Sequence, residues 1–373
     1  MTSLWSRFGL ALALAGLTQV GAAAIKTAER PEQPKHAAKP EVRVAQAAPR
    51  PAAPTPPRAP AYLSERLDAL GKAFDGRVGI AVRSVDEGWE TGWKDDELYP
   101  QQSVSKLWVA ITALDAVDKG KVRLDDRVTL TRSDLTLFHQ PIRAKILSGG
   151  YTTSLEDLME KAITTSDNTA NDKLMRSVGG ADAVRRMIAA KRLGAIRFYD
   201  GERALQSKIA GLIWSQSYSI GGGFFEARNA LPMAVRRAAF NRYVDDPYDG
   251  ASASAIVSAL ARLKKGELLS PASTARLLNI MGNTRTGPNR LKGGLQPGWT
   301  LSHKTGTGQE LAGVQAGYND IGILTSPDGK SYTVAVMIKK TSTPLPVRMA
   351  LMNNVVKAVI RQHEMAKGTD YAL

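Results

Sequence analysis

Two side chains near residue 105 have the types and the spacing of a nucleophile and its base. Ser103 and Lys106 are three residues apart, and an apolar pattern that begins at Leu107 predicts a helix. Side chains at this spacing share one face of a helix, so the ammonium can reach the serine hydroxyl. The helix N-terminus also favours negative charge that develops on the serine oxygen. The pair predicts a serine nucleophile, and a helix cap beside a surface lysine is the alternative.

Other catalytic devices are missing from the sequence. It contains no cysteine, which excludes disulfides, thiolate nucleophiles and cysteine-ligated metals. It has no Gly-x-Ser-x-Gly elbow, His-Glu-x-x-His motif or Gly-rich phosphate loop. A Ser-His-Asp triad would need His139 or His303. We interpret His139 as a structural residue at the rim of the cleft, and His303 as a residue that either tunes Lys304 or merely packs. We therefore predict a reaction that uses neither a metal nor an organic cofactor.

Two tripeptides farther along the chain change the interpretation of Ser103. Ser166-Asp167-Asn168 follows an amphipathic helical pattern, and Lys304-Thr305-Gly306 lies on a predicted strand. Each tripeptide is expected by chance in roughly one chain in ten of ordinary composition. Their occurrence together with Ser103 and Lys106, in this order and on these elements, indicates one site.

The elements that must position these motifs follow from the apolar periodicity. A helix from residue 62 precedes a hairpin over 78–93, residues 104–280 are mostly helical, and strands at 300–338 precede a last helix at 347–363. The two ends of this domain should form one antiparallel sheet flanked by helices, with an inserted all-helical lobe. This layout is an α+β fold, and we expect the site in the crevice between sheet and lobe.

The residues before the predicted domain have the composition of targeting and linker segments. Arg7, an apolar run over 8–20 and small residues at 22–24 predict a signal peptide over 1–24, with an uncleaved anchor as the alternative. Residues 25–61 are rich in Pro, Ala, Lys and Arg, which predicts a disordered basic tether. We expect the catalytic domain over 62–366 and a tail over 367–373.

The strongly basic net charge of the chain has two possible explanations, and the predicted export decides between them. The formal net charge is +15, which suits either nucleic acid or an anionic cell envelope. An exported chain does not meet cytoplasmic nucleic acid. We therefore predict a periplasmic or secreted monomer whose basic tether contacts the envelope, with no nucleic-acid partner.

Together, the three motifs resemble those of the serine β-lactamase and penicillin-binding protein superfamily, and of class A within it. The resemblance covers about residues 62 to 365. Glu202-Arg203-Ala204-Leu205-Gln206 is similar to the Glu-x-x-Leu-Asn segment of class A. The stretches 286–290 and 294–299 are similar to those that precede Lys-Thr-Gly in the family.

The resemblance implies a catalytic role for four residues. Ser103 would attack a lactam or acyl carbonyl and form an acyl-enzyme, and its proton would pass to Lys106, or to Glu202 through a water. Ser166 would relay a proton to the leaving nitrogen. Glu202 would activate the water that removes the acyl group.

The resemblance also implies a substrate-binding set. Backbone N–H groups of Ser103 and Thr307 would form an oxyanion hole, and Asn168 would bind the substrate amide. The substrate carboxylate would lie near cationic and hydroxyl groups, and Gln206 would hold the hydrolytic water. The remaining members of this set are Arg290, Lys304, Thr305 and Gly306.

Several features depart from the class A pattern. Gln206 stands where the family usually has Asn, and Asp200-Gly201 stands where an arginine commonly pins the loop by a salt bridge. Roughly 30 extra residues follow Gln206, more than an ordinary connection needs. This insertion, residues 207–249, is either a lid that alters substrate choice or an extension that packs its aromatics on the domain exterior. Tyr218 as a base is a further alternative.

The predicted function is that of a periplasmic serine hydrolase that opens β-lactams, with Glu202 assisting deacylation. The first alternative is a cell-wall DD-peptidase or an esterase that uses the same serine. The second is a penicillin-acylated sensor or wall-binding module that stays acylated. Glu202 favours the β-lactamase, whereas the altered loop favours the alternatives. Under each, the substrate is a small β-lactam or a peptidoglycan-like acyl compound.

Overall fold

The computed structural model describes residues 57–368. The predicted signal peptide, nearly all of the predicted tether and most of the predicted tail lie outside this part. Within it, no helix combines the length and the hydropathy that a bilayer crossing requires. The predicted site residues, in contrast, all lie in the described part.

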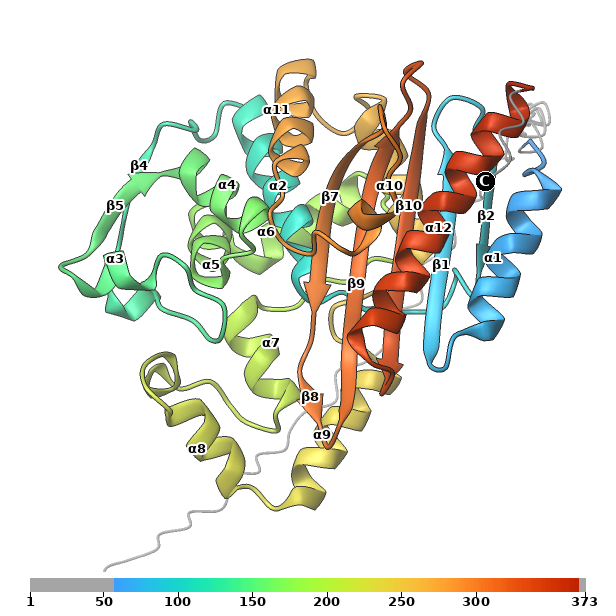
Figure 1. Ribbon diagram of the computed structural model, residues 1–373. Helices are drawn as coiled ribbons and strands as arrows, with labels where there is room; N and C mark the ends of the chain where they lie inside the picture. Colours follow the sequence, from blue (N-terminus) through green and yellow to red (C-terminus); the bar gives the residue numbers. More distant parts are fainter. Residues whose placement is uncertain (1–56, 369–373) are drawn as a thin grey trace, which may run out of the picture. The chain divides into compact units, whose positions relative to one another are not determined.

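A six-stranded antiparallel sheet joins the two ends of the described chain. Its strand order is β2 (Glu90–Trp93), β1 (Arg77–Ser84), β10 (Ser331–Thr341), β9 (Val314–Thr325) and β7 (Thr300–Thr307), and β8 (Glu310–Leu311) pairs with β9. Both predicted hairpins are present, because β2 follows β1 and β10 follows β9 in antiparallel pairing. The α+β fold class is therefore confirmed (Figure 1).

Alternating side chains give the central strands two apolar faces. On β10, Val334 and Val336 face α1 (Ala61–Ala73) and α12 (Leu345–Ala366), whereas Ala335 and Met337 belong to the core of the helical lobe. Period-two alternation sends successive side chains to opposite faces, so a strand covered on both sides is apolar throughout. Figure 1 shows α12 lying across the sheet and α1 beside it.

The middle of the chain forms the helical lobe that the sequence predicts. A small two-stranded antiparallel sheet of β4 (Arg127–Leu130) and β5 (Tyr151–Ser154) lies at its edge, and β3 (Tyr99–Pro100) pairs with β6 (Gly250–Ala251) beside the main sheet. Serine or aspartate side chains cap the N-termini of four of the helices below, which satisfies backbone N–H groups there. The helices of the lobe are α2 (Lys106–Asp118), α3 (Arg143–Leu147), α4 (Leu155–Thr164), α5 (Asn168–Ser177), α6 (Gly180–Ala190), α10 (Ala253–Lys264) and α11 (Pro271–Gly282).

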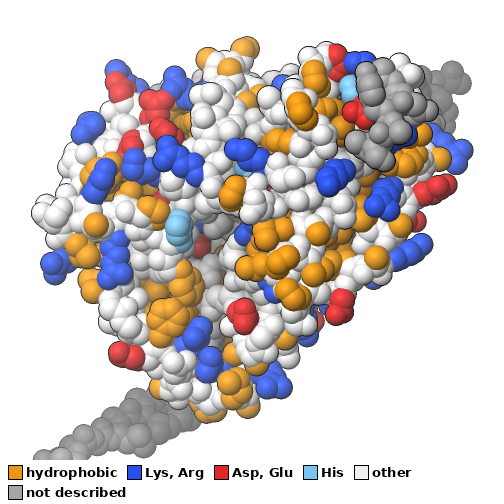
Figure 2. Space-filling view, in the orientation of Figure 1, with side chains coloured by type: hydrophobic (Ala, Val, Ile, Leu, Met, Phe, Trp, Pro, Cys, Tyr) orange, Lys and Arg blue, Asp and Glu red, His pale blue; other side chains and the backbone are white. Residues whose placement is uncertain are grey.

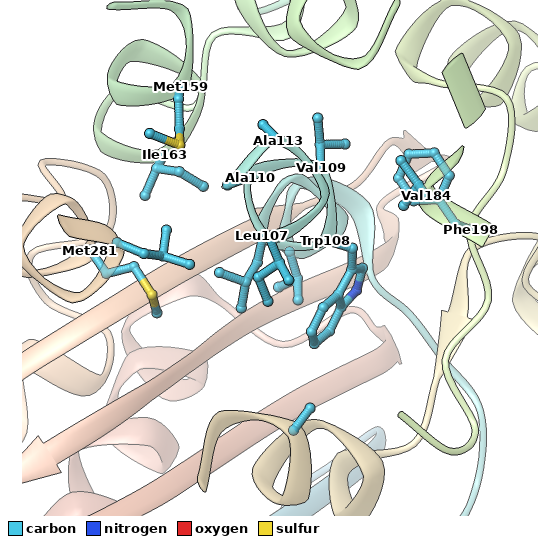
Figure 3. Packing of buried hydrophobic residues seen from close by; sticks show 14 of the residues in the cluster. Leu107, Trp108, Val109, Ala110, Ala113, Met159, Ile163, Val184, Phe198 and Met281 are labelled. Carbon is cyan, nitrogen blue, oxygen red and sulfur yellow. The ribbon is translucent and has the colours of Figure 1, made fainter. Parts of the chain in front are cut away.

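Helix α2, which carries Lys106 at its first position, runs through the centre of the lobe. Its residues from Lys106 to Leu114 are all buried, so it is apolar on every side rather than amphipathic. Figure 3 shows Leu107 and Trp108 among side chains of neighbouring segments, with Met281 on one side and Phe198 on the other. This packing fixes the start of α2, and Ser103 lies in the turn that immediately precedes this helix.

The 207–249 insertion begins within α7 (Glu202–Ile209) and contains α8 (Gly223–Ala230) and α9 (Met233–Asp245). Phe240 and Tyr243 of α9 are buried against Leu205 and Ile209 of α7. Phe224 of α8 is buried in a second apolar cluster. Two small apolar clusters, each shared with the rest of the domain, therefore hold the insertion in place.

Candidate active site

A short 3-10 turn, Gln102–Ser105, presents the predicted nucleophile and leads directly into α2. Lys106 is fully buried, and its Nζ donates to Ser103 Oγ at 2.6 Å and to Asn168 Oδ1 at 2.8 Å. The same nitrogen forms an ion pair with Glu202 Oε1. A buried ammonium is costly without a counter-ion, so Glu202 stabilises it. If Glu202 first takes a proton from this ammonium, the neutral amine that remains can accept the proton of the Ser103 hydroxyl.

The second motif lies at the N-terminus of α5. Ser166 has a left-handed backbone with φ of 58°. The Asp167 carboxylate caps α5 through Ala170 N at 2.8 Å and accepts Ile142 N at 2.8 Å, and burial raises the pKa of Asp167. Asn168 is held from its other end, because its Nδ2 donates to the Leu137 carbonyl at 2.8 Å. These bonds fix the amide that contacts Lys106.

The third motif lies on β7, next to the first two. Lys304 Nζ donates to Ser166 Oγ at 3.0 Å and to the Thr305 carbonyl at 2.9 Å. Burial, reinforced by the nearby charges of Lys106 and Arg290, holds the pKa of Lys304 well below its usual value. Lys304 is completely buried, so it acts on the site through Ser166 rather than by direct exposure.

Gly306 allows β7 to approach the turn that carries Ser103. A Cβ atom at this position would lie 2.3 Å from the Gln101 carbonyl oxygen, which no side chain tolerates. Asn319 of β9 supports the same approach, because its Nδ2 donates to the carbonyls of Pro100 and Gln101 at 2.7 and 3.1 Å. The first and third motifs are therefore in backbone contact.

Arg290 braces the end of β7. Its guanidinium donates to the Gly306 and Asn319 carbonyls at 2.9 and 2.6 Å and to Thr307 Oγ1 at 2.5 Å. It also stacks 3.8 Å above the Tyr318 ring. The arginine is mostly buried but lines the catalytic cavity together with Thr307. It thus orients Thr307 and supplies positive charge to that wall.

The loop before Glu202 is held by an aspartate that sequence reasoning missed. Asp172 of α5 accepts the backbone N–H of Glu202 at 2.9 Å and that of Arg203 at 3.4 Å. Burial, and then the charge of Glu202, raises the pKa of this carboxyl. The expected arginine pin is replaced by this contact, while Asp200 forms an exposed ion pair with Arg185 at 3.0 Å.

Behind the nucleophile, a buried polar network connects Gln206 to the insertion. Gln206 Nε2 donates to Glu202 Oε2 at 3.2 Å and to Gln102 Oε1 at 3.0 Å. Gln102 Nε2 donates to the Tyr243 hydroxyl at 2.6 Å, and that hydroxyl donates to Asp249 Oδ1 at 2.9 Å. Asp249 Oδ2 accepts the Gln102 backbone N–H at 2.7 Å. Gln102 has a left-handed φ of 53°, which these bonds hold next to Ser103.

Desolvation dominates the electrostatics of this network. Burial raises the pKa of Asp249 to about 7, against the lowering effect of its hydrogen bonds to Gln102 and Tyr243. Burial and the Asp249 charge together raise the pKa of Tyr243 well above its usual value. The network therefore favours a neutral tyrosine and leaves Asp249 able to titrate near neutral pH.

A cavity of about 550 Å³ opens at this point. Three predicted residues do not line this cavity: Lys106, Lys304 and Gly306. Tyr218 does not line it either, and the Tyr218 ring packs against the rings of Trp214 and Phe224. No group of three or more His, Cys, Asp or Glu side chains between residues 57 and 368 could hold a metal ion. The predicted residues that line the cavity are Ser103, Ser166, Asn168, Glu202, Gln206, Arg290, Thr305 and Thr307.

Other lining residues lie outside the predicted catalytic and substrate-binding sets. His139 lies at the rim, as a structural residue whose Nε2 is 2.7 Å from the Thr165 carbonyl oxygen. Phe225 and Arg228 come from α8, so the insertion both packs on the domain and reaches the cavity. The two interpretations of the insertion are thus compatible. The run of glycines and phenylalanines at 221–225 was the only sequence signal for this wall.

Comparisons with known proteins agree with this geometry. A family model described as the β-lactamase enzyme family matches residues 62–363. An extended-spectrum β-lactamase, PER-1, of Pseudomonas aeruginosa is 29% identical over 82% of this chain and 88% of its own length. β-Lactamase VEB-1 of the same organism is 26% identical over 79% of this chain and 88% of its own length. A crystal structure of a β-lactamase from Chitinophaga pinensis DSM 2588 superposes with a TM-score of 0.67 at 26% identity, covering 81% of this chain and 99% of the other. The chain therefore belongs to the β-lactamase enzyme family, and within it to the class A type of serine hydrolase.

Proposed function

We propose that this protein is an exported β-lactamase that opens β-lactams through an acyl-enzyme on Ser103 and releases the product with help from Glu202. One observation carries the proposal: the buried Lys106 ammonium contacts the Ser103 hydroxyl, the Asn168 amide and the Glu202 carboxylate together. A nucleophile, a proton acceptor and a substrate-amide ligand are thereby held around one atom.

The acylation step uses the first motif. Ser103 Oγ attacks the lactam carbonyl carbon, its proton leaves toward Lys106 or toward Glu202 through a water, and the lactam C–N bond breaks. The ion pair between Lys106 and Glu202 supports both routes: Glu202 can take a proton from the ammonium and leave a neutral amine to accept the serine proton, or it can accept the serine proton itself through the water. Ser166, which accepts a hydrogen bond from Lys304 at 3.0 Å, then returns a proton to the leaving nitrogen.

Charge stabilisation comes from the wall formed by β7. The backbone N–H groups of Ser103 and Thr307 form the oxyanion hole, where one donor contributes about 3 kcal/mol to the transition state. Arg290, Thr305 and Thr307 receive the substrate carboxylate, since all three line the cavity. Lys304 contributes its field from behind the wall.

Deacylation separates a β-lactamase from the alternatives. Glu202 lines the same cavity as Ser103, and both contact one ammonium nitrogen, so a single water can bridge the carboxylate and the acylated oxygen. Gln206 orients the second carboxylate oxygen at 3.2 Å. This placement of Glu202 favours a β-lactamase, so a DD-peptidase, an esterase and an acylated sensor rank second.

The cellular setting is part of the same proposal. Residues 1–24 direct export, residues 25–61 form the basic tether toward an anionic envelope, and the mature domain acts as a periplasmic or secreted monomer.

The test is hydrolysis of a chromogenic cephalosporin by the purified mature domain, with the adduct followed by mass spectrometry. Sustained turnover with little adduct is the expected result. A stoichiometric burst with a stable adduct would favour a peptidase or sensor. Ser103→Ala should abolish both turnover and adduct, and an adduct that survives this substitution would overturn the assignment of the nucleophile.

A further inference from the structure

Helix α8 brings a cation and an aromatic ring into the wall of the catalytic cavity. Arg228 and Phe225 both line it, and neither belongs to a motif that the proposed chemistry uses. We propose that they form a subsite for the acyl side chain of the substrate, and that this subsite selects side chains that carry an aryl ring and an anionic group. The inference rests on the proposed function and specifies its substrate class.

Arg228 has the properties of a residue that lacks its anion. Among residues 57–368 it has no ion-pair partner and no side-chain hydrogen bond, and its guanidinium lies over the rings of Phe224 and Phe225. Its Nε atom is buried without a partner, and burial, then the nearby Arg236, lowers the pKa of the guanidinium. Glu310 lines the same cavity but does not pair with it. A guanidinium offers five donors, and a carboxylate inside the cavity would satisfy several of them.

The rings beside Arg228 form an apolar platform. Phe225 lies 5.2 Å from the guanidinium and packs edge to face on Phe224 at 5.6 Å. Phe138, which also lines the cavity, lies 6.2 Å from Phe225. Phe138 and Phe225 are 42% and 47% exposed, so both retain surface for a ligand. Figure 2 shows hydrophobic side chains gathered at a hollow on the face that carries α7 and α8.

Phe138 is held in this place at a conformational cost. Its φ of 59° lies in the left-handed region, which bulky residues rarely adopt. Strain of this kind persists where the surroundings impose it, and it concentrates at ligand sites. The preceding residue, Leu137, is buried and accepts the Asn168 amide hydrogen bond, so the chain turns outward immediately after a catalytic contact.

The position of Phe138 and Phe225 in the cavity determines which part of the substrate they contact. The substrate carboxylate is assigned to Arg290, Thr305 and Thr307 on β7, and the substrate amide to Asn168. Because Phe138 follows the residue that Asn168 contacts, an acyl group extending from that amide reaches the platform of Phe138 and Phe225. An anionic substituent on the same side chain then lies next to Arg228.

The experiment compares two penicillins of matched structure. Benzylpenicillin and carbenicillin share the aryl side chain and differ only in one carboxylate on it. In Arg228→Gln, the kcat/KM for carbenicillin should fall about 10-fold or more relative to that for benzylpenicillin, as expected for losing hydrogen bonds to a charged group. Arg228→Lys should keep part of this preference. The control is Arg242→Gln, which removes an exposed arginine of α9 outside the cavity and should leave the ratio unchanged.

A second variant tests the aromatic part. Phe225→Ala should lower kcat/KM for benzylpenicillin about 2-fold to 10-fold relative to the penicillin nucleus without a side chain. Equal losses for both penicillins in Arg228→Gln would overturn the subsite while hydrolysis itself continued. If the wild-type protein neither hydrolyses either penicillin nor forms an adduct, the proposed function fails, and the subsite with it.

Discussion

Asp249 should make the stability of the folded domain fall as pH rises toward neutrality. The carboxyl is completely buried behind the nucleophile, where burial raises its pKa to about 7. In the unfolded chain its pKa returns to the usual 3.8. Below about pH 4 the group is protonated in both states, so it contributes no pH dependence there.

The sign and the size of the effect follow from proton binding. Between about pH 4 and about pH 7 the unfolded chain has released this proton while the folded chain keeps it, so unfolding becomes easier by about 1.4 kcal/mol for each pH unit. Displacement of the pKa from 3.8 to about 7 thus corresponds to about 4 kcal/mol of lost stability. Above about pH 7 both states are ionised and the loss is constant.

The assay measures the difference between the wild-type domain and Asp249→Asn. Urea unfolding followed by tryptophan fluorescence gives the free energy of unfolding at several pH values. The asparagine cannot ionise, so the variant should gain about 4 kcal/mol relative to wild type from about pH 4 to about pH 8, on top of a constant offset from altered hydrogen bonding. Contributions from Asp167 and Asp172 cancel in this difference.

The control is Asp245→Asn, because the Asp245 side chain is 74% exposed and its variant should give a curve parallel to wild type. If the curve of the Asp249 variant is also parallel, Asp249 is ionised in the folded domain throughout this range. The reasoning from burial would then be refuted.

Three further predictions concern other parts of the site and the core. Glu202→Gln should slow deacylation at least about 100-fold and accumulate acyl-enzyme, which mass spectrometry detects; unchanged turnover would remove Glu202 from that step. Asp172→Ala should release the backbone of Glu202 and lower steady-state turnover while a penicillin adduct still forms, whereas Asp172→Asn keeps an acceptor and should retain more turnover. Trp108→Ala should lower the free energy of unfolding by about 3–5 kcal/mol, measured in urea, because this side chain is fully buried in α2; a loss below about 1 kcal/mol would contradict the packing.

Much of the fold was predictable because it depends on local periodicity. The strand pattern near residues 78–85 corresponds to β1, and the turn at 327–329 lies within the β9–β10 hairpin. The continuous apolar run after Lys106 predicted a helix, and its burial on all sides explains the lack of a polar face. Such patterns extend over many residues, so a single residue that departs from the periodicity does not obscure the helix or strand.

The buried polar network was not predictable for the opposite reason. Each member is one residue in an ordinary local context, and its partner lies far away in the chain: Gln102 and Asp249 are 147 positions apart. The same holds for Asp172, whose contact with Glu202 spans 30 positions. The sequence showed that an arginine was missing before Glu202 but carried no signal for the aspartate that replaces its function. Only the tertiary arrangement shows which carboxylate holds the loop.

The insertion contacts both the proposed side-chain subsite and the turn that carries Ser103. Its helix α9 places Tyr243 behind Gln102, the residue that precedes Ser103, whereas its helix α8 places Arg228 in the cavity wall in front. Only Leu231 and Pro232 separate the two helices in the chain, so a shift of α8 acts directly on α9. Deletions or insertions that displace α8 should therefore also alter the hydrogen bonds that hold the left-handed Gln102. A segment that departs from the class A pattern thus contacts the residue before Ser103 through α9 and the proposed side-chain subsite through α8.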